Sequence, residues 1–232
     1  MEDTAMKTRC IGILSLICLV LTIGWLIFLI AGMAVAGPLE TFEQALKYVE
    51  KADVLFYITY TNAALVTMSV VMLFSGFYLH YRHVAPEWSV IAAMFVPLYG
   101  GMNLVVYLSQ VTIVPRLIEL QSMVEYESQA NFLLRQGIQP WPDSAVSVVN
   151  NLAYAVLGVP SIIFGVLMIQ STSALRSGGI LLSLNGIACI AGFIGIVLQS
   201  PWLSQGSLAG GVIFLLALVP ISIGFLKQSS KV

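Results

Sequence analysis

Six stretches of the chain are made almost entirely of apolar residues, and each is long enough to cross a lipid bilayer as a helix. A helical span needs about 20 mostly apolar residues. The six stretches cover residues 11–36, 54–77, 89–109, 145–169, 179–198 and 207–226. None of them contains Asp, Glu, Lys, Arg or His, so all charged residues fall in the connections and at the two ends.

The composition agrees with a membrane protein. Of the 232 residues, 59% are apolar and only 9% are charged, whereas a soluble domain typically has about 25% charged residues. The spans must be helices, because irregular backbone cannot face lipid and the alternating pattern of membrane barrel strands is missing. We therefore predict an all-α fold, a polytopic membrane helix bundle of six transmembrane helices in a single integral membrane domain, residues 1–232. With a net charge of −1, the chain has no excess of positive charge that would attract nucleic acid.

The first apolar stretch has some features of a signal peptide. Lys7 and Arg9 precede it, and its end, Ala34-Val35-Ala36-Gly37, is similar to a signal-peptidase site. The stretch is 26 residues long, however, and the apolar part of a signal peptide usually has only about 7–15 residues. We expect it to be retained as a transmembrane helix.

The distribution of basic residues predicts the orientation. Lys and Arg in short loops favour the cytoplasmic side. The side with both termini has six basic residues, and the opposite side has four: Lys47, Lys51, Arg116 and Arg135. This predicts a multi-pass protein of the plasma (inner) membrane with cytoplasmic N- and C-termini.

Two connections on the predicted outer side, residues 37–53 and 110–144, are long and amphipathic. Each has apolar residues at helical spacing, and Gly137 is expected to end the second stripe. We predict that both helices lie at the outer membrane surface, the first with its stripe buried in lipid, and that the second caps the bundle. The two predicted stripes are Leu39, Phe42, Leu46 and Val49 in the first connection, and Leu120, Met123, Tyr126, Ala130 and Leu133 in the second.

Neutral polar residues are clustered within three of the spans. In the third span, polar side chains recur at steps of four, four and three residues, which places them on one helical face. With polar residues of the second and fourth spans, they predict an outward-facing pocket for a neutral amphipathic or lipid-like small molecule, since apolar walls with a few converging polar groups are typical of ligand sites. The candidate ligand-binding residues are Tyr60, Asn62, Tyr99, Asn103, Tyr107, Asn151 and Tyr154.

Two alternatives remain open. Amides and hydroxyls within a membrane also hydrogen-bond between helices, so the protein could instead be a structural or accessory subunit that binds a membrane-protein partner or a second copy of itself. Glycines of the last two spans, such as Gly192, Gly195, Gly206 and Gly210, are expected to permit close helix approach. A membrane-embedded enzyme using His80, His83 and Glu87 is the second alternative.

The sequence contains no recognisable catalytic motif, phosphate-binding loop or metal-ligand spacing, so we predict no cofactor, no metal and no catalytic residues. An enzyme is the less favoured interpretation. The absence of ionisable residues within the spans argues against a proton-driven pump, but not against a carrier of neutral solutes. Membrane lipids are the partners that the composition itself implies.

Two short segments carry a family resemblance. Lys7-Thr8-Arg9 leads directly into the first span, and Ala174-Leu175-Arg176-Ser177-Gly178-Gly179-Ile180-Leu181-Leu182 opens the fifth. With the order of the spans, these segments resemble an uncharacterised prokaryotic family of six-span membrane proteins known only as a domain of unknown function. The resemblance implies a six-span fold and supplies no activity or site residues.

Overall fold

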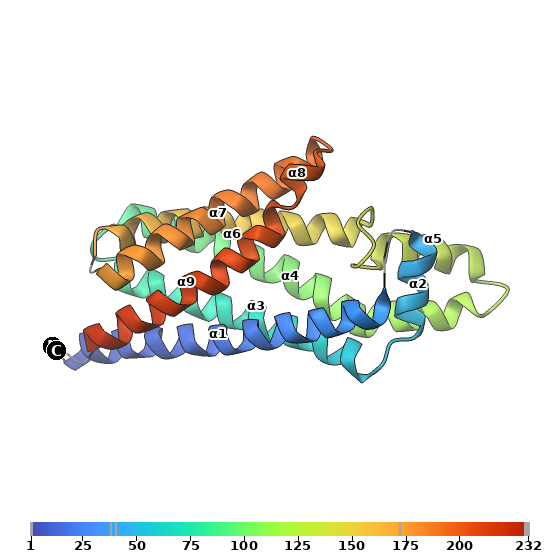
Figure 1. The fold of residues 1–232 in the computed structure, drawn as a ribbon, viewed down its shortest axis with the longest axis horizontal. Coiled ribbons are helices and arrows are strands. Elements are labelled where there is room, and N and C mark those ends of the chain that lie inside the picture. Colours follow the sequence, from blue (N-terminus) through green and yellow to red (C-terminus); the bar gives the residue numbers. More distant parts are fainter. Residues whose placement is uncertain (1, 38, 40, 172, 230–232) are drawn as a thin grey trace. The chain divides into compact units, whose positions relative to one another are not determined.

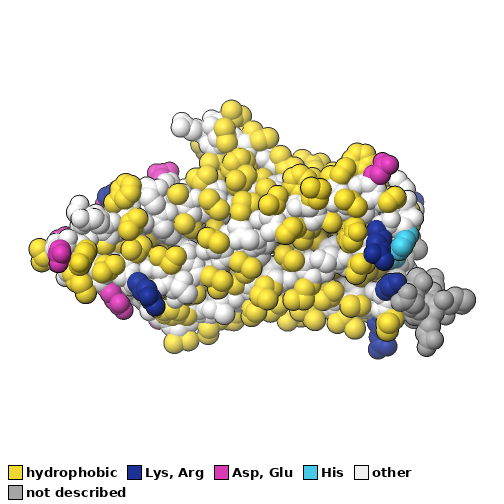
Figure 2. Space-filling model, turned by 180° about the vertical axis from the view of Figure 1, so that it is seen from behind, with side chains coloured by type: hydrophobic (Ala, Val, Ile, Leu, Met, Phe, Trp, Pro, Cys, Tyr) yellow, Lys and Arg dark blue, Asp and Glu magenta, His cyan; other side chains and the backbone are white. Residues whose placement is uncertain are grey.

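The computed structural model describes residues 2–37, 39, 41–171 and 173–229, and this part of the chain is all-α, without strands. Six of its helical segments are long and apolar enough to cross a membrane, as predicted. Hydrophobic side chains cover much of the face shown in Figure 2, where charged side chains are few. The chain is therefore a multi-pass membrane protein.

The helices follow one another with short connections (Figure 1). Their bounds are α1 Glu2–Ala36, α2 Phe42–Glu50, α3 Val54–Tyr81, α4 Pro86–Gln121, α5 Glu127–Gly137, α6 Ala145–Ile169, α7 Ser173–Val197, α8 Pro201–Ser204 and α9 Gly206–Ser229.

The chain forms two compact units, each assembled from separate segments. Unit 1 comprises Met1–Thr22, Met68–Gly100 and Asn151–Val232, and unit 2 comprises Ile23–Thr67 and Gly101–Asn150. The helices α1, α3, α4 and α6 each contribute residues to both units. The single domain expected from the sequence stays a prediction.

In unit 1, helices approach so closely that only glycine fits at the contact points. A Cβ atom on Gly158 of α6 would lie 2.7 Å from the carbonyl oxygen of Gly186 in α7, and a Cβ on Gly186 would in turn meet the Gly158 carbonyl oxygen. Gly165 and Gly179 form a second reciprocal pair between the same helices. Such backbone contact is the packing that small residues permit in membranes.

The same packing joins α7 to α8 and α9. Cβ atoms on Gly192 and Gly195 would meet the backbone of residues 203–207, and a Cβ on Gly206 would meet the backbone of α7. Gly210 lies against Cys189. The expectation that these glycines permit close helix approach is confirmed.

Unit 2 contains the two short amphipathic helices, which pack on a shared hydrophobic core. Arg135 of α5 lies 3.6 Å from the carboxylate of Glu43 in α2, and its guanidinium lies 4.3 Å from the centre of the Phe42 ring. Phe42 also makes an edge contact with Trp141, with ring centres 6.3 Å apart. The core beneath them consists of Phe42, Ala45, Val49, Phe56, Tyr60, Ala63, Ala64, Val106, Tyr107, Val114, Leu134 and Ile138.

The prediction that lipid buries the stripe of the first connection was wrong. Phe42, Ala45 and Val49 are buried in the protein's own core, Leu46 is only partly buried there, and Leu39 precedes the helix. The helix starts at a capping box: Thr41 Oγ1 accepts from the Gln44 amide at 3.3 Å, and Gln44 Oε1 accepts from the Thr41 amide at 3.1 Å. This Thr-x-x-Gln pattern was a start signal visible in the sequence.

The second connection also differs from its prediction. Helix α4 continues to Gln121 instead of ending near Ser109, so only the segment after it forms the connection. Helix α5 ends at Gly137, as expected, but its buried residues are Ala130 and Leu134. The predicted stripe was displaced because Leu120 belongs to α4 and a turn at 122–126 separates the two helices, which breaks the assumed continuous periodicity.

Candidate functional site

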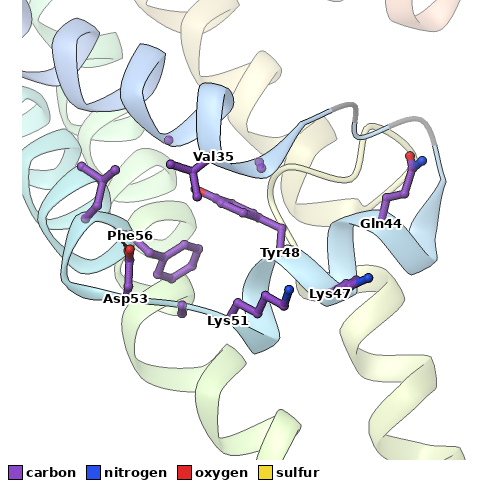
Figure 3. A pocket seen from close by; sticks show the side chains of 11 residues that line it. Val35, Gln44, Lys47, Tyr48, Lys51, Asp53 and Phe56 are labelled. Atoms are coloured by element: carbon purple, nitrogen blue, oxygen red, sulfur yellow. Dashed lines mark hydrogen bonds between the residues drawn. The ribbon is translucent and has the colours of Figure 1, made fainter.

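Unit 2 contains a cavity of about 340 Å³ between the end of α1, one side of α2 with the residues that follow it, and the start of α3 (Figure 3). Its lining combines apolar side chains with lysine, aspartate, tyrosine and glutamine groups. The volume lies at the lower end of the range for small-molecule sites, about 300–1,000 Å³. The lining residues are Gly32, Val35, Ala36, Gln44, Lys47, Tyr48, Lys51, Ala52, Asp53, Leu55 and Phe56.

Tyr48 connects the three walls of this cavity. Its ring meets Phe56 of α3 edge-on, with ring centres 5.7 Å apart, and in Figure 3 it reaches from α2 towards Val35 at the end of α1. A Cβ atom on Gly32 would lie only 3.2 Å from the Tyr48 hydroxyl oxygen. The missing side chain at Gly32 therefore makes room for the Tyr48 hydroxyl beside α1.

Two lysines and one aspartate carry the charge of the cavity. Lys47 and Lys51 are both exposed; Lys47 lies in the last turn of α2, and Lys51 is the C-cap residue of this helix. The Asp53 carboxylate accepts a hydrogen bond from the Phe56 amide at 3.0 Å and so caps the start of α3. The cavity thus combines an apolar interior with a cationic edge.

The predicted ligand-binding residues are divided between the two units. In unit 2, Tyr60, Asn103 and Tyr107 are buried and Asn62 is partly buried. The rings of Tyr60 and Tyr107 lie 6.4 Å apart. In unit 1, Tyr99 is buried, and its ring centre lies 6.3 Å from that of Tyr154, while Asn151 is partly buried.

None of these seven residues lines the α1–α2–α3 cavity. The shared helical face predicted for the third span is the buried face of α4, because Tyr99, Asn103, Tyr107 and Gln110 are all at most 4% exposed. Whether the seven residues form one binding site stays a prediction.

Tyr60 belongs to a hydrogen-bond network that fixes the segment after α5. Its hydroxyl donates to Gln139 Oε1 at 3.0 Å. The side chain of Gln110 binds the same segment twice: its Nε2 donates to the Gly137 carbonyl oxygen, and its Oε1 accepts from the Gln139 amide, both at 2.9 Å. The network therefore gives Tyr60 and Gln110 a structural role.

Asn103 is different, because its amide has no partner. Its side chain is fully buried, and neither Oδ1 nor Nδ2 has a hydrogen-bond partner among the described residues. A buried polar group without a partner costs about 1–3 kcal/mol. Such groups in native proteins often mark a position for water or a ligand.

His80, His83 and Glu87 were the residues of the membrane-embedded enzyme alternative. The structure gives each of them a separate environment. The ring of His80 packs edge-on against Tyr81 and Phe225, with centres 4.7 and 5.2 Å apart. His83 is exposed, and its Nε2 accepts a hydrogen bond from Arg82 Nε at 3.2 Å. Glu87 is exposed in the first turn of α4. Among the described residues, no group of three or more potential metal ligands is found.

Sequence reasoning missed two features. The first is Asn185, whose Nδ2 donates to the Gly210 carbonyl oxygen at 2.9 Å and so links α7 to α9. The second is the cavity itself, for which the only available signal was the charge pattern of Lys47, Lys51 and Asp53 around a tyrosine. That pattern is also typical of an ordinary solvated helix face.

Comparison of the chain with protein-family models, with curated proteins and with solved structures finds no match. The family resemblance of residues 7–9 and 174–182 therefore stays a prediction, and the functional argument depends on the residues of this chain alone.

Proposed function

We propose that this membrane protein binds an amphipathic, lipid-like small molecule in the α1–α2–α3 cavity of unit 2. The observation that carries this proposal is the cavity's position, at the last turn of α1 and the first turn of α3, two helices long enough to span the membrane. A molecule bound there would place its polar group among the α2 side chains and its chain along Val35, Leu55 and Phe56.

The orientation predicted from the basic residues places this cavity on the outer side of the plasma membrane. Six basic residues on the side of the termini, against four on the side of α2 and α5, support this orientation. The proposed site is then an outward-facing one, as the sequence suggested. If the bound molecule were released on the opposite side of the membrane, the protein would be a carrier of that molecule.

The test is thermal unfolding of the purified full-length chain in detergent, with monomyristoylglycerol as the neutral amphiphilic probe. We expect the probe to raise the unfolding midpoint by about 4 °C at ten times its Kd. Ala36→Trp should abolish this shift, because Ala36 lines the cavity and a tryptophan would occupy the space.

Ala34→Trp is the matched control. Ala34 lies in the same last turn of α1, is exposed and does not line the cavity. We expect this variant to keep the full shift. An equal response of the two variants, or no response of the unmodified protein, would contradict binding in the cavity.

Asn103 supports a second candidate site, formed with the predicted polar residues of unit 2, which are Tyr60, Asn62 and Tyr107. A ligand that hydrogen-bonds its unpaired amide would offset the cost of burying it. We expect Asn103→Leu to lose ligand-dependent stabilisation for a ligand of this second site, while Ala36→Trp keeps it. If Asn103→Leu is simply more stable than the unmodified chain and responds normally to every amphiphile, this second site does not exist.

A further inference from the structure

The two lysines at the edge of the α1–α2–α3 cavity indicate which amphiphiles fit it. We propose that the cavity is selective for amphiphiles with an anionic headgroup, a phosphate or carboxylate held by Lys47 and Lys51. This inference rests on the proposed function, because it specifies the headgroup of the molecule bound there.

The first support is that neither lysine has an anionic partner in the part of the chain that the structure describes. Among the described residues, no carboxylate lies within ion-pair distance of either ammonium group. Glu43 is four residues before Lys47 and could have paired with it along the helix, but its carboxylate lies 3.6 Å from Arg135 of α5. Arg135 therefore competes with Lys47 for Glu43, and Glu50, three residues after Lys47, forms no ion pair with it in the described part of the chain.

The second support is that Lys47, in the last turn of α2, and Lys51, the C-cap residue of this helix, place two like charges at the same end of α2. Both lysines line the same cavity (Figure 3). A phosphate or carboxylate bound there would be attracted by both ammonium groups at once. The arrangement favours a divalent or bidentate anionic headgroup over a neutral one.

Asp53 is the one acidic group in the lining and needs to be weighed against the lysines. Its Oδ1 accepts a hydrogen bond from the Phe56 amide at the start of α3, where the positive end of the helix dipole offsets its charge. The lining therefore keeps an excess of one positive charge. The repulsion between the Asp53 carboxylate and a bound anion is smaller than the attraction between that anion and the two lysines.

Tyr48 adds a neutral donor to another wall of the cavity, because its hydroxyl lies beside Gly32 of α1. Burial raises the pKa of its hydroxyl above the ordinary value, and the nearby Asp53 carboxylate raises it further. The hydroxyl therefore keeps its proton at neutral and mildly alkaline pH and can donate it in a hydrogen bond to an anionic oxygen. A tyrosinate at this position would repel the headgroup.

The experiment is a competition between two lipids that differ only in the headgroup, read out by native mass spectrometry of the full-length chain. The probes are myristoyl lysophosphatidylglycerol, which is anionic, and myristoyl lysophosphatidylcholine, which is zwitterionic. At equal concentrations we expect about tenfold more anionic adduct, since each lysine near an anionic lipid contributes about 1 kcal/mol before screening. The preference should decrease as salt is added.

The double variant Lys47→Gln/Lys51→Gln should bind both lipids about equally and should retain the zwitterionic adduct of the unmodified chain. Lys47→Arg/Lys51→Arg should keep the preference. Arg116→Gln is the matched control, because Arg116 is an exposed basic residue of unit 2 outside the cavity lining. Loss of the preference in this control would attribute it to general surface charge and overturn the inference.

Inorganic phosphate alone distinguishes a lipid headgroup from a free anion. We expect millimolar phosphate neither to stabilise the chain nor to displace the anionic lipid. Full displacement by phosphate would overturn the lipid assignment. Equal binding of both lipids to the unmodified chain, blocked by Ala36→Trp, would overturn the anionic selectivity and leave the proposed function standing, whereas binding of neither lipid would contradict the proposed function itself.

Discussion

Gly186→Ala is expected to lower the free energy of unfolding by about 1–2 kcal/mol, although alanine is the better helix former. The new methyl group would meet the carbonyl oxygen of Gly158 and lie 2.8 Å from Cγ1 of Ile162. Backbone atoms cannot rotate away, so α6 and α7 must separate. Overpacking costs about 1–3 kcal/mol or more, which exceeds the gain of about 1 kcal/mol in helix propensity.

Gly211→Ala is the matched control for this variant. Gly211 lies in α9 of the same unit, and a Cβ atom there would meet nothing within 4 Å. It should therefore be neutral or stabilising by up to about 1 kcal/mol. The measurement is unfolding of the purified chain in detergent. If both variants behave alike, the close contact between α6 and α7 is not what stabilises unit 1.

This packing could have been predicted in part from the sequence. Gly158 and Gly165 are seven residues apart in one span, and Gly179 and Gly186 are seven apart in the next. Two consecutive antiparallel spans with equal glycine spacing place both pairs at matching heights. The sequence indicated small residues as contact points in the last two spans, but it did not show which helices would use them, since that choice depends on long-range packing.

The lengths of the apolar stretches predicted the six spans, but they did not predict where the helices end. The third apolar stretch stops near Ser109, but α4 continues to Gln121 because Val114 is buried in the core of unit 2, with Leu117 and Ile118 packed against it. The end of an apolar run shows where lipid contact ends. It does not show where the backbone hydrogen bonds of the helix end, because protein contacts can support the helix beyond that point.

The candidate site was less predictable from the sequence, because it too depends on contacts between residues that are far apart in the chain. Periodicity alone placed Tyr107 and Gln110 on the buried face of α4. It could not identify Gln139, the partner of both Tyr60 and Gln110, because Gln139 is 79 and 29 residues away from them in the chain. The α1–α2–α3 cavity likewise depends on how Tyr48 packs beside Gly32 and Phe56, and no local pattern specifies that space.

Gln110→Leu is the second variant with a large expected effect, a loss of about 3 kcal/mol in the free energy of unfolding. The substitution introduces an apolar side chain of similar size and removes both hydrogen bonds to the segment after α5. It leaves the Gly137 carbonyl and the Gln139 amide without partners, and each such group costs about 1–3 kcal/mol when it is buried.

Thr112→Val controls for the loss of a polar side chain from α4. Thr112 is exposed, and its hydroxyl donates only to the Leu108 carbonyl oxygen of its own helix, at 2.7 Å. This variant should change stability by no more than about 0.5 kcal/mol. A comparable loss in both variants would show that any polar-to-apolar change weakens α4.

A double-mutant cycle with Tyr60→Phe separates a network from two independent contacts. Tyr60→Phe removes only the hydrogen bond to Gln139 Oε1 and should cost about 1 kcal/mol. Once Gln110→Leu has released the Gln139 backbone, that bond no longer holds a fixed partner, so the double variant should be more stable than the sum predicts by about 0.5–1 kcal/mol. Strict additivity would mean that Tyr60 and Gln110 act separately. Coupling would show that α3 and α4 jointly fix the segment after α5, which keeps α5 beside α2 and thereby supports the wall of the cavity that α2 forms.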